Sequence, residues 1–366
     1  MITQPFIKPS DDFFEPRQRL KIQKHFDVNS IKKIVIRGID PLGDMAIGTA
    51  FFREVRQCFP NAHILNLVSE HASQWVENCP YIDEVRVFSK KAFWPAVKQL
   101  REEQHDLIFL LTGNLRAALL AYFAGIPNRI GFDSDGRGPL LTVRLHQELH
   151  SRYRAEDLFD MLRAIGFSPD GVFQREYWLS EKERVEAEAV FQKHSIDTHK
   201  ELMAFNPFAR DDMRRWDSKN WIDLLTQLQQ KGVQSVMFVG PNETQQAQSL
   251  LDEWHLTDIP VIEENLLVTA AMLEKFEWVV GADSGFIHMA LAVDKPHVIG
   301  IFGVMPPVSC FPVQDPRHQA VIKSSLPCAP CYLYKGSDTC FNELKCMKEL
   351  SAEEILSAME AIRQRS

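Results

Sequence analysis

The sequence predicts an α/β protein with two successive halves, each built on a parallel sheet. Short apolar runs alternate with helical patterns of 10–15 residues from residue 34 onward, which is typical of βαβ units. The alternation pauses near residues 175–200 and then starts again. A length of 366 residues is enough for about two domains, each with its own core.

The first half contains the strands and helices of one such unit. The expected strands span residues 34–38, 63–69, 84–88, 106–113 and 128–132. The expected helices between and after them span residues 44–58, 93–104, 114–125, 152–167 and 182–194. The last two are amphipathic or charged and lead up to the boundary between the halves.

The second half repeats the pattern. Strands are expected at residues 202–209, 235–240, 278–281 and 297–303, and helices at residues 220–231, 243–254 and 267–276. A final helix is predicted over residues 352–363, because Ser351 with Glu354 three residues later forms a capping box.

Composition excludes several classes of protein. A net charge of -8 argues against nucleic acid as the main partner. No apolar run approaches the ~18 residues of a membrane-spanning helix, and the first residues do not resemble a secretory signal. Seven cysteines, four of them between Cys328 and Cys346, indicate a reducing compartment and a local metal or thiol cluster. We therefore expect a cytoplasmic protein.

The most informative motif is Ala282-Asp283-Ser284-Gly285, which ends an apolar strand and opens a short helix containing His288. Small residues at a helix start let backbone N–H groups approach an anion, and the helix dipole favours negative charge there. The motif predicts a phosphate-binding site, although His288 could also be a core histidine.

Gly43-Asp44 occupies the first strand-to-helix junction. Ligands of open α/β sheets bind beyond the carboxyl ends of the strands, where Asp44 could act as a general base. Capping of the following helix is the more common role of such an aspartate, and Asp40 is a rival carboxylate.

Two further positions suit a nucleotide. Arg214 lies in the arginine-rich loop Arg210–Arg215 after a strand, where a guanidinium could contact phosphate or remain solvated. Glu243 follows the next strand and could accept the two hydroxyls of a ribose.

Together these residues resemble glycosyltransferase family 9, the lipopolysaccharide heptosyltransferase family. The resemblance covers nearly all of the chain from residue 31. It rests on Gly43-Asp44, the Arg214-Arg215-Trp216 loop, the block from Ala282 to Ala290, Phe302-Gly303 and the terminal cysteines.

The resemblance implies a GT-B fold, with two Rossmann-like domains facing a central cleft. Residues 1–180 would bind the acceptor, residues 181–350 the nucleotide sugar, and residues 351–366 would form a helix returning to the first domain. The implied reaction is inverting transfer of L-glycero-D-manno-heptose from ADP-heptose to a Kdo or heptose of the lipopolysaccharide core, with no catalytic metal.

The resemblance also implies roles for single residues. Asp44 matches the catalytic base and Gly43 its neighbour in the substrate site, Glu243 matches the ribose-binding acid, and Arg214 stands where the family often has a lysine. Asp283, Ser284, Gly285 and His288 match the block that binds pyrophosphate and sugar. The loop from Arg37 to Asp44 is one residue longer than the common form, which leaves Asp40 and Asp44 as competing candidates.

Two features are open. Cys328, Cys331, Cys340 and Cys346 could close a structural Zn or Fe site, or pack as reduced thiols. The basic stretch from Arg17 to Lys33 could meet anionic lipid on the inner membrane or a phosphorylated acceptor, or it could form an ordinary solvated face. The alternatives for function are a family member with another nucleotide sugar or a protein acceptor, and a nucleotide-sugar-binding protein without transferase activity.

Overall fold

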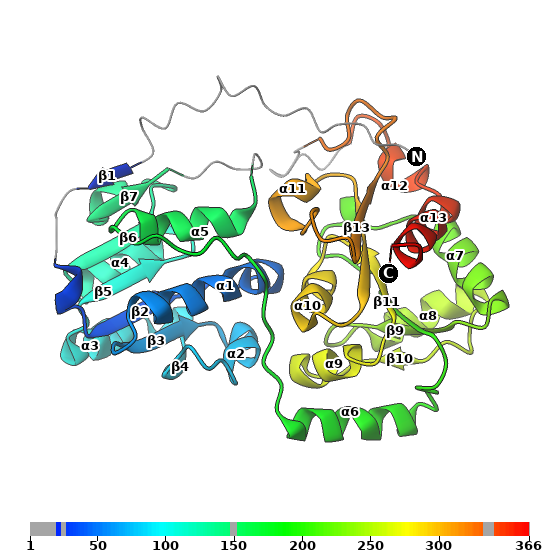
Figure 1. The fold of residues 1–366 in the computed structure, drawn as a ribbon, viewed down its shortest axis with the longest axis horizontal. Coiled ribbons are helices and arrows are strands. Elements are labelled where there is room, and N and C mark those ends of the chain that lie inside the picture. Colours follow the sequence, from blue (N-terminus) through cyan, green and yellow to red (C-terminus); the bar gives the residue numbers. More distant parts are fainter. Residues whose placement is uncertain (1–19, 23–26, 147–151, 332–339, 366) are drawn as a thin grey trace.

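The computed structural model describes residues 20–22, 27–146, 152–331 and 340–365, which fold into two α/β halves side by side (Figure 1). Part of the basic stretch from Arg17 to Lys33, residues 17–19 and 23–26, lies outside the described residues. None of the helices in the described ranges is both long and apolar enough to cross a bilayer.

The first half contains a seven-stranded sheet in the order β1-β7-β6-β5-β2-β3-β4, parallel except for the pair of β1 with β7. Its strands are β1 (Leu20–Ile22), β2 (Lys33–Arg37), β3 (His63–Val68), β4 (Glu84–Val87), β5 (Leu107–Leu110), β6 (Asn128–Phe132) and β7 (Val143–Leu145). The chain runs outward from β2 in both directions, so the topology reverses between β2 and β5.

The second half contains a six-stranded parallel sheet in the order β10-β9-β8-β11-β12-β13. Its strands are β8 (Leu202–Asn206), β9 (Gln234–Phe238), β10 (Val261–Ile262), β11 (Trp278–Ala282), β12 (His297–Phe302) and β13 (His318–Ile322). Here the topology reverses between β8 and β11. The predicted fold class, α/β with two parallel-sheet domains, is confirmed.

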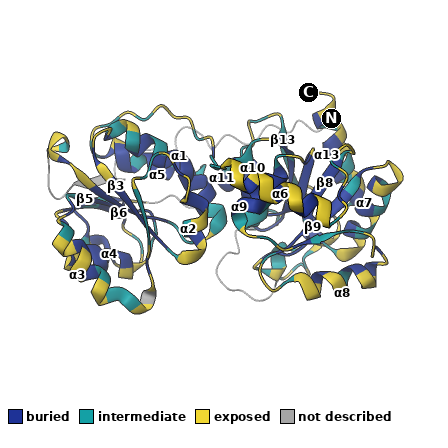
Figure 2. Cartoon of the chain, turned by 90° about the horizontal axis from the view of Figure 1, so that it is seen from below, coloured by how far each residue is buried: buried dark blue, intermediate teal, exposed yellow. Residues whose placement is uncertain are grey.

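Helices cover both faces of each sheet. They are α1 (Leu42–Cys58), α2 (Glu70–Val76), α3 (Phe93–Glu103), α4 (Leu115–Phe123), α5 (Arg154–Arg163), α6 (Glu181–Lys193), α7 (Ser218–Gln230), α8 (Thr244–Trp254), α9 (Leu266–Leu273), α10 (Gly285–Val293), α11 (Pro307–Cys310), α12 (Lys345–Lys348) and α13 (Ala352–Arg363). In the first half α1 and α5 lie on one face of the sheet, and α3 and α4 lie on the other (Figure 2).

Successive side chains along each strand point to opposite faces of the sheet and so contribute to the apolar cores on both faces. On β8, Ala204 faces the helices between the two halves, whereas Met203 and Phe205 face α7 and α13. The apolar cluster between the halves is continuous: it includes Phe51 of α1 and Ile287 of α10. The two halves therefore share a hydrophobic interface, with α1 packed against α10.

The C-terminal helix does not return to the first domain, and that expectation is wrong. α13 packs against α7 and against β12 and β13 of the second sheet (Figure 1). Its apolar stripe, including Ile355 and Met359, enters the same core as Trp221 and Leu224 of α7. Because this apolar stripe is already buried in the second half, the helix has no exposed apolar face that would pack against the first domain.

The segment from residue 164 to residue 180 joins the two halves and is held on both. Glu176 accepts from Arg53 of α1 at 2.5 Å and from the Tyr81 hydroxyl at 3.1 Å. Tyr177 packs edge-on against Trp75 of α2. On the other side, Arg175 donates to the carbonyl of Cys310 at the end of α11.

Candidate active site

The predicted site residues lie where the topology of each sheet reverses. Asp44 follows β2, Arg214 follows β8 within a short 3-10 turn (Asp212–Arg214), and Asp283 follows β11. At such a point, the loops of neighbouring strands diverge to opposite sides and leave room for a ligand at the carboxyl edge.

Two glycines bring the helix starts of the two halves together. A Cβ at Gly43 of α1 would lie 2.5 Å from Cδ2 of His288, and one at Gly285 of α10 would lie 3.1 Å from Cβ of Leu42. Close approach therefore explains the glycine at both positions. The first N–H groups of each helix have no partner within the helix and carry partial positive charge. The contact creates a region that favours an anion.

The structure separates the roles of Asp40 and Asp44. Asp40 binds the buried Arg37 guanidinium at 2.9 Å and accepts from the Ser69 N–H at 3.1 Å. Burial raises the pKa of Asp40, but the hydrogen bonds and charge of Arg37 outweigh it and hold the pKa below its usual value. Asp40 is thus engaged in holding the β2–α1 loop. Asp44 lies in the first turn of α1, close to His288 of the second half.

Within the described part of the chain, Asp44 forms an ion pair with Arg154, at 2.5 Å between Oδ1 and Nη1. Both side chains keep some exposure, 23% for Asp44 and 36% for Arg154. Arg154 is the first residue of α5, a place where the helix dipole disfavours a cation. That unfavourable placement is the sequence signal by which Arg154 could have been found, and sequence reasoning missed it.

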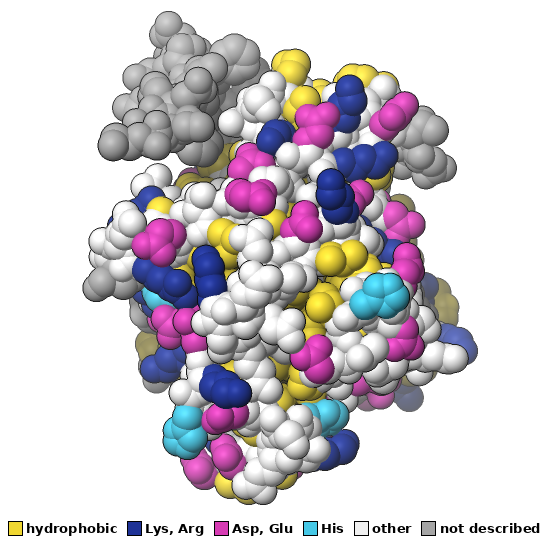
Figure 3. All heavy atoms as spheres, turned by 90° about the vertical axis from the view of Figure 1, so that its right-hand side faces the viewer, with side chains coloured by type: hydrophobic (Ala, Val, Ile, Leu, Met, Phe, Trp, Pro, Cys, Tyr) yellow, Lys and Arg dark blue, Asp and Glu magenta, His cyan; other side chains and the backbone are white. Residues whose placement is uncertain are grey.

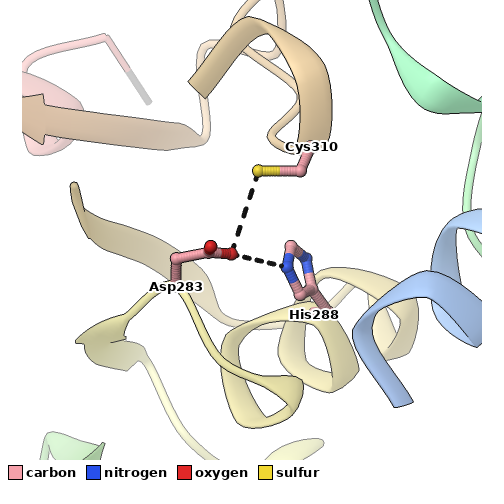
Figure 4. A group of neighbouring side chains, drawn as sticks. All are labelled: Asp283, His288 and Cys310. Carbon is pink, nitrogen blue, oxygen red and sulfur yellow. Dashed lines mark hydrogen bonds and ion pairs between the residues drawn. The ribbon is translucent and has the colours of Figure 1, made fainter. Parts of the chain in front are cut away.

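Asp283 is the centre of a buried cluster of hydrogen-bond donors (Figure 4). Its Oδ2 accepts from Nη1 of Arg214 at 2.9 Å, and its Oδ1 from Nε2 of His288 at 3.1 Å. The thiol of Cys310 points at the same Oδ1 from 3.8 Å. With its carboxylate surrounded by these donors, Asp283 positions Arg214 and His288.

The protonation states fit this arrangement. Burial raises the pKa of Asp283, but the hydrogen bond from His288 and the charge of Arg214 outweigh it, so the carboxyl is ionised. Burial lowers the pKa of His288, opposed by the Asp283 hydrogen bond and reinforced by the charge of Arg175. His288 is therefore neutral near pH 7. Burial raises the pKa of the Cys310 thiol, which remains protonated.

The same cluster is a poor metal site. Ligand atoms of Asp283, His288 and Cys310 lie within 4.8 Å of one another. Arg214 occupies one carboxylate oxygen, however, and the charge of Arg154 also reaches Asp283. A divalent cation would have to enter beside these two guanidinium groups. The residues fit an anion far better than a metal.

Several buried polar atoms at the site have no hydrogen-bond partner within the described residues. They are Nδ1 of His288, Oγ of Ser284, and Nε and Nη1 of Arg175. A buried polar group without a hydrogen-bond partner costs free energy, so a ligand that pairs these groups would gain binding free energy. Arg175, which is 4% exposed, was not found from the sequence, because an extended linker gives no periodic signal.

Glu243 stands on the same edge of the second sheet, after β9. Its Oε2 accepts from the Gly240 N–H at 2.7 Å, which fixes the loop that leads into α8. The strands β9, β8 and β11 are neighbours, so Glu243, Arg214 and Asp283 follow three adjacent strands. Among the residues that the structure describes, no hydrogen bond or ion pair joins Glu243 to the Asp283 cluster, and a ligand touching both would have to extend along the edge.

The four C-terminal cysteines lie near one another. Burial raises the pKa of Cys346 to about 11, and the charges of Cys331, Cys340 and Cys328 contribute to the shift. Two sulfurs accept hydrogen bonds at 3.4 Å, Cys328 from the Asn342 side chain and Cys340 from the Leu344 N–H. Among the described residues, the four sulfurs do not form a ligand group within 4.8 Å. Their chemistry fits a thiolate site, but ligation would have to draw them closer.

Comparison with known proteins identifies relatives over most of the chain. The sequence pattern of glycosyltransferase family 9 (heptosyltransferase) matches residues 94–340. Lipopolysaccharide heptosyltransferase 2 of Salmonella typhimurium is 23% identical over 303 residues, covering 75% of this chain and 84% of that protein.

Solved structures show the same architecture. The family 9 glycosyl transferase of Veillonella parvula superposes with a TM-score of 0.77 at 21% identity, covering 92% of this chain and 98% of that one. The E. coli ADP-heptose lipopolysaccharide heptosyltransferase II gives a TM-score of 0.75 at 19% identity, covering 92% and 100%. At these identities the likeness establishes the GT-B fold.

Proposed function

The chain belongs to glycosyltransferase family 9, the heptosyltransferase family, and we propose that it moves L-glycero-D-manno-heptose from ADP-heptose to a hydroxyl of a lipopolysaccharide core acceptor. The acceptor sugar would be a Kdo or a heptose. The names of the relatives support this donor and acceptor, and so does the chemistry of the site.

The observation that carries the proposal is the set of unpaired donors beside the start of α10. The Ser284 hydroxyl is a buried donor at the N-terminus of α10 with no partner among the described residues. Arg175, whose charge reaches His288 of the same helix, adds a buried guanidinium that is not saturated by backbone acceptors. Phosphate oxygens are the acceptors that such a set fits. The unpaired Nδ1 of His288 accepts instead, and it suits a sugar hydroxyl.

In the proposed reaction, Asp44 removes the proton of the acceptor hydroxyl as its oxygen attacks the anomeric carbon. The new glycosidic bond forms on the face opposite ADP, the bond to the β-phosphate oxygen breaks, and the configuration inverts. The proton ends on Asp44, and the negative charge ends on ADP. Arg214, Arg175 and the N–H groups of Ser284 and Gly285 would stabilise that charge as it develops.

Arg154 would hold Asp44 in place before the acceptor arrives. Its ion pair fixes the carboxylate at the start of α1, and acceptor binding can take over part of that contact. Glu243 would bind the ribose hydroxyls of the donor from the neighbouring strand. No metal takes part in these steps.

Calorimetric titration with ADP tests the donor site. Arg214→Ala should weaken ADP binding by about 10–100-fold, because it removes a charge-assisted contact and releases Asp283. Arg215→Ala is the matched control: Arg215 lies over the Phe208 ring and donates to the Ala209 carbonyl, away from Asp283. If Arg214→Ala and Arg215→Ala bound ADP with equal affinity, the donor site would not lie at this edge of the sheet.

A thermal-shift comparison of ADP-heptose with UDP- and GDP-sugars distinguishes the main proposal from its alternatives. A ligand that binds the native state raises the melting temperature. Stabilisation by ADP-heptose together with turnover supports heptosyl transfer. Stabilisation by another nucleotide sugar points to a different donor, and binding with no transfer to any acceptor points to a binding protein.

We also propose that Cys328, Cys331, Cys340 and Cys346 hold a structural Zn or Fe ion. Binding would contribute to folding, because the site does not exist in the unfolded chain. Elemental analysis of untagged protein should find about one ion per chain. Cys346→Ser should release it and lower the melting temperature, with little effect on the chemical step. Metal-free protein with four titratable thiols and unchanged stability would contradict the proposal.

A further inference from the structure

The outer face of the first half carries a cluster of exposed aromatic side chains, which we call the aromatic patch: Trp94 on α3 with Tyr122 and Phe123 on α4. They are 63%, 52% and 37% exposed. The ring of Trp94 lies 5.4 Å from that of Phe123, and the rings of Phe123 and Tyr122 are 5.7 Å apart. Scattered exposed apolar residues are normal, but three adjacent aromatic rings are not.

The aromatic patch is additional to the core of this half. α3 and α4 already bury a separate face against the sheet, through residues such as Leu100 and Leu120, which are 1% and 0% exposed. The patch therefore does not arise from incomplete packing. The helices that carry it, α3 and α4, lie on the face of the sheet opposite α1, whose start approaches α10 (Figure 2).

Basic side chains surround the rings. The guanidinium of Arg129 lies 5.7 Å from the Tyr122 ring, that of Arg116 lies 5.0 Å from the Phe93 ring, and Arg101 donates to the Phe123 carbonyl. Residues 91–103 and 113–129 contain five Lys and Arg against two acids, Glu102 and Glu103 at the end of α3, so the net charge of these segments is positive.

This local surplus of positive charge contrasts with the rest of the chain. The molecule as a whole has a net charge of -8. On the outer side of the second half, basic and acidic side chains are intermixed (Figure 3). The charge around the rings is therefore a property of this face.

We infer that the aromatic patch and its basic surround form a docking surface for an anionic phospholipid bilayer. Trp and Tyr rings are favoured at the level of the lipid headgroups, where one end of the side chain is apolar and the other is wet. Lys and Arg beside them attract anionic headgroups, each contributing about a fivefold change in binding. The inference rests on no part of the proposed function.

Vesicle flotation of the full-length chain tests this surface. We expect binding to phosphatidylcholine vesicles that contain phosphatidylglycerol, much weaker binding to phosphatidylcholine alone, and a decrease as salt is added. Trp94→Ala with Phe123→Ala should reduce binding to the anionic vesicles by roughly tenfold or more. Phe341→Ala, which removes a ring that is 78% exposed in the second half, is the matched control and should bind like the wild type.

Fluorescence gives a second measurement that does not depend on substitution. Brominated lipids quench a tryptophan that enters the bilayer interface, and Trp94 is well placed for this, whereas Trp75, Trp221 and Trp278 are buried. Quenching in anionic vesicles supports the surface. Absence of vesicle binding, binding unchanged in the Trp94/Phe123 variant, or an equal loss in Phe341→Ala would overturn it. So would sedimentation showing that the patch variant only converts a dimer into a monomer.

Discussion

At the scale of the residue, two aspartates four positions apart illustrate how surroundings assign roles. Asp40 is held by the buried Arg37 and by the Ser69 N–H, so its carboxylate is committed to the fold. Asp44 is held by one partly exposed arginine and lies near His288 across the interface. Both lie in one loop that is one residue longer than the common family form. Sequence alone therefore left them as competing candidates for the general base.

His318 is a second residue whose surroundings decide its chemistry. It begins β13, and its Nδ1 accepts from the Val298 N–H at 3.2 Å, which requires a neutral ring. Burial lowers its pKa to about 4, although the charge of Asp315 opposes this. The unfolded chain therefore binds the proton more readily than the folded one. The stability due to neutral His318 is fully present above about pH 6.5 and is lost as the pH falls toward 4.

A pH series of urea unfolding checks that behaviour. Between about pH 7 and about pH 5, the wild type should lose about 1–2 kcal/mol through His318. His318→Asn keeps an acceptor for Val298 but cannot be protonated, so its free energy of unfolding should fall less over the same range. His71→Asn, on the exposed surface of α2, should follow the wild type. Parallel pH curves for His318→Asn and wild type would refute the assignment.

At the scale of the element, the start of α1 is shaped by its contact with α10. Gly43→Ala would place a methyl group 2.5 Å from the buried His288 ring, which must then move away from Asp283. We expect a loss of about 1–3 kcal/mol in unfolding free energy and a sharp loss of activity.

Gly48→Ala on the same helix is the matched control for that change. Its Cβ would meet Leu158 at 3.7 Å, an ordinary contact, and alanine favours a helix interior by about 0.5–1 kcal/mol. Chemical denaturation of the two variants measures the difference. Equal stability of Gly43→Ala and wild type would mean that the two helix starts do not approach so closely.

Long periodic elements could be predicted from the sequence, and short or edge elements could not. The strands from β2 to β6 and the helices α1, α3 and α4 match apolar runs or helical periods within a few residues. The short strands β1 and β10 and the edge strand β13 were missed, because edge strands with mixed burial carry little apolar signal. The site block after β11 was recognisable because a small-residue turn joins a buried strand to a helix.

At the scale of the whole molecule, contacts between distant segments lay beyond sequence reasoning. The sequence placed Gly43-Asp44 and the motif from Asp283 to Gly285 at strand ends, but gave no sign that the two glycines bring α1 and α10 together. It gave no reason to expect Arg175, which crosses from the linker to the carbonyl of Cys310. It also misplaced α13, because an amphipathic stripe reveals that a helix is buried and not which sheet buries it.

The most direct test of the proposed function is single-turnover transfer from ADP-heptose by Asp44→Asn, measured together with its affinity for ADP. A general base contributes about 10²–10⁴-fold to the rate, so transfer should fall by that factor while ADP affinity stays within about twofold of wild type. Asp40→Asn should lose stability and keep most of its rate per folded molecule. Full transfer activity in Asp44→Asn, with activity abolished in folded Asp40→Asn, would contradict the assignment of the base and the orientation of the site.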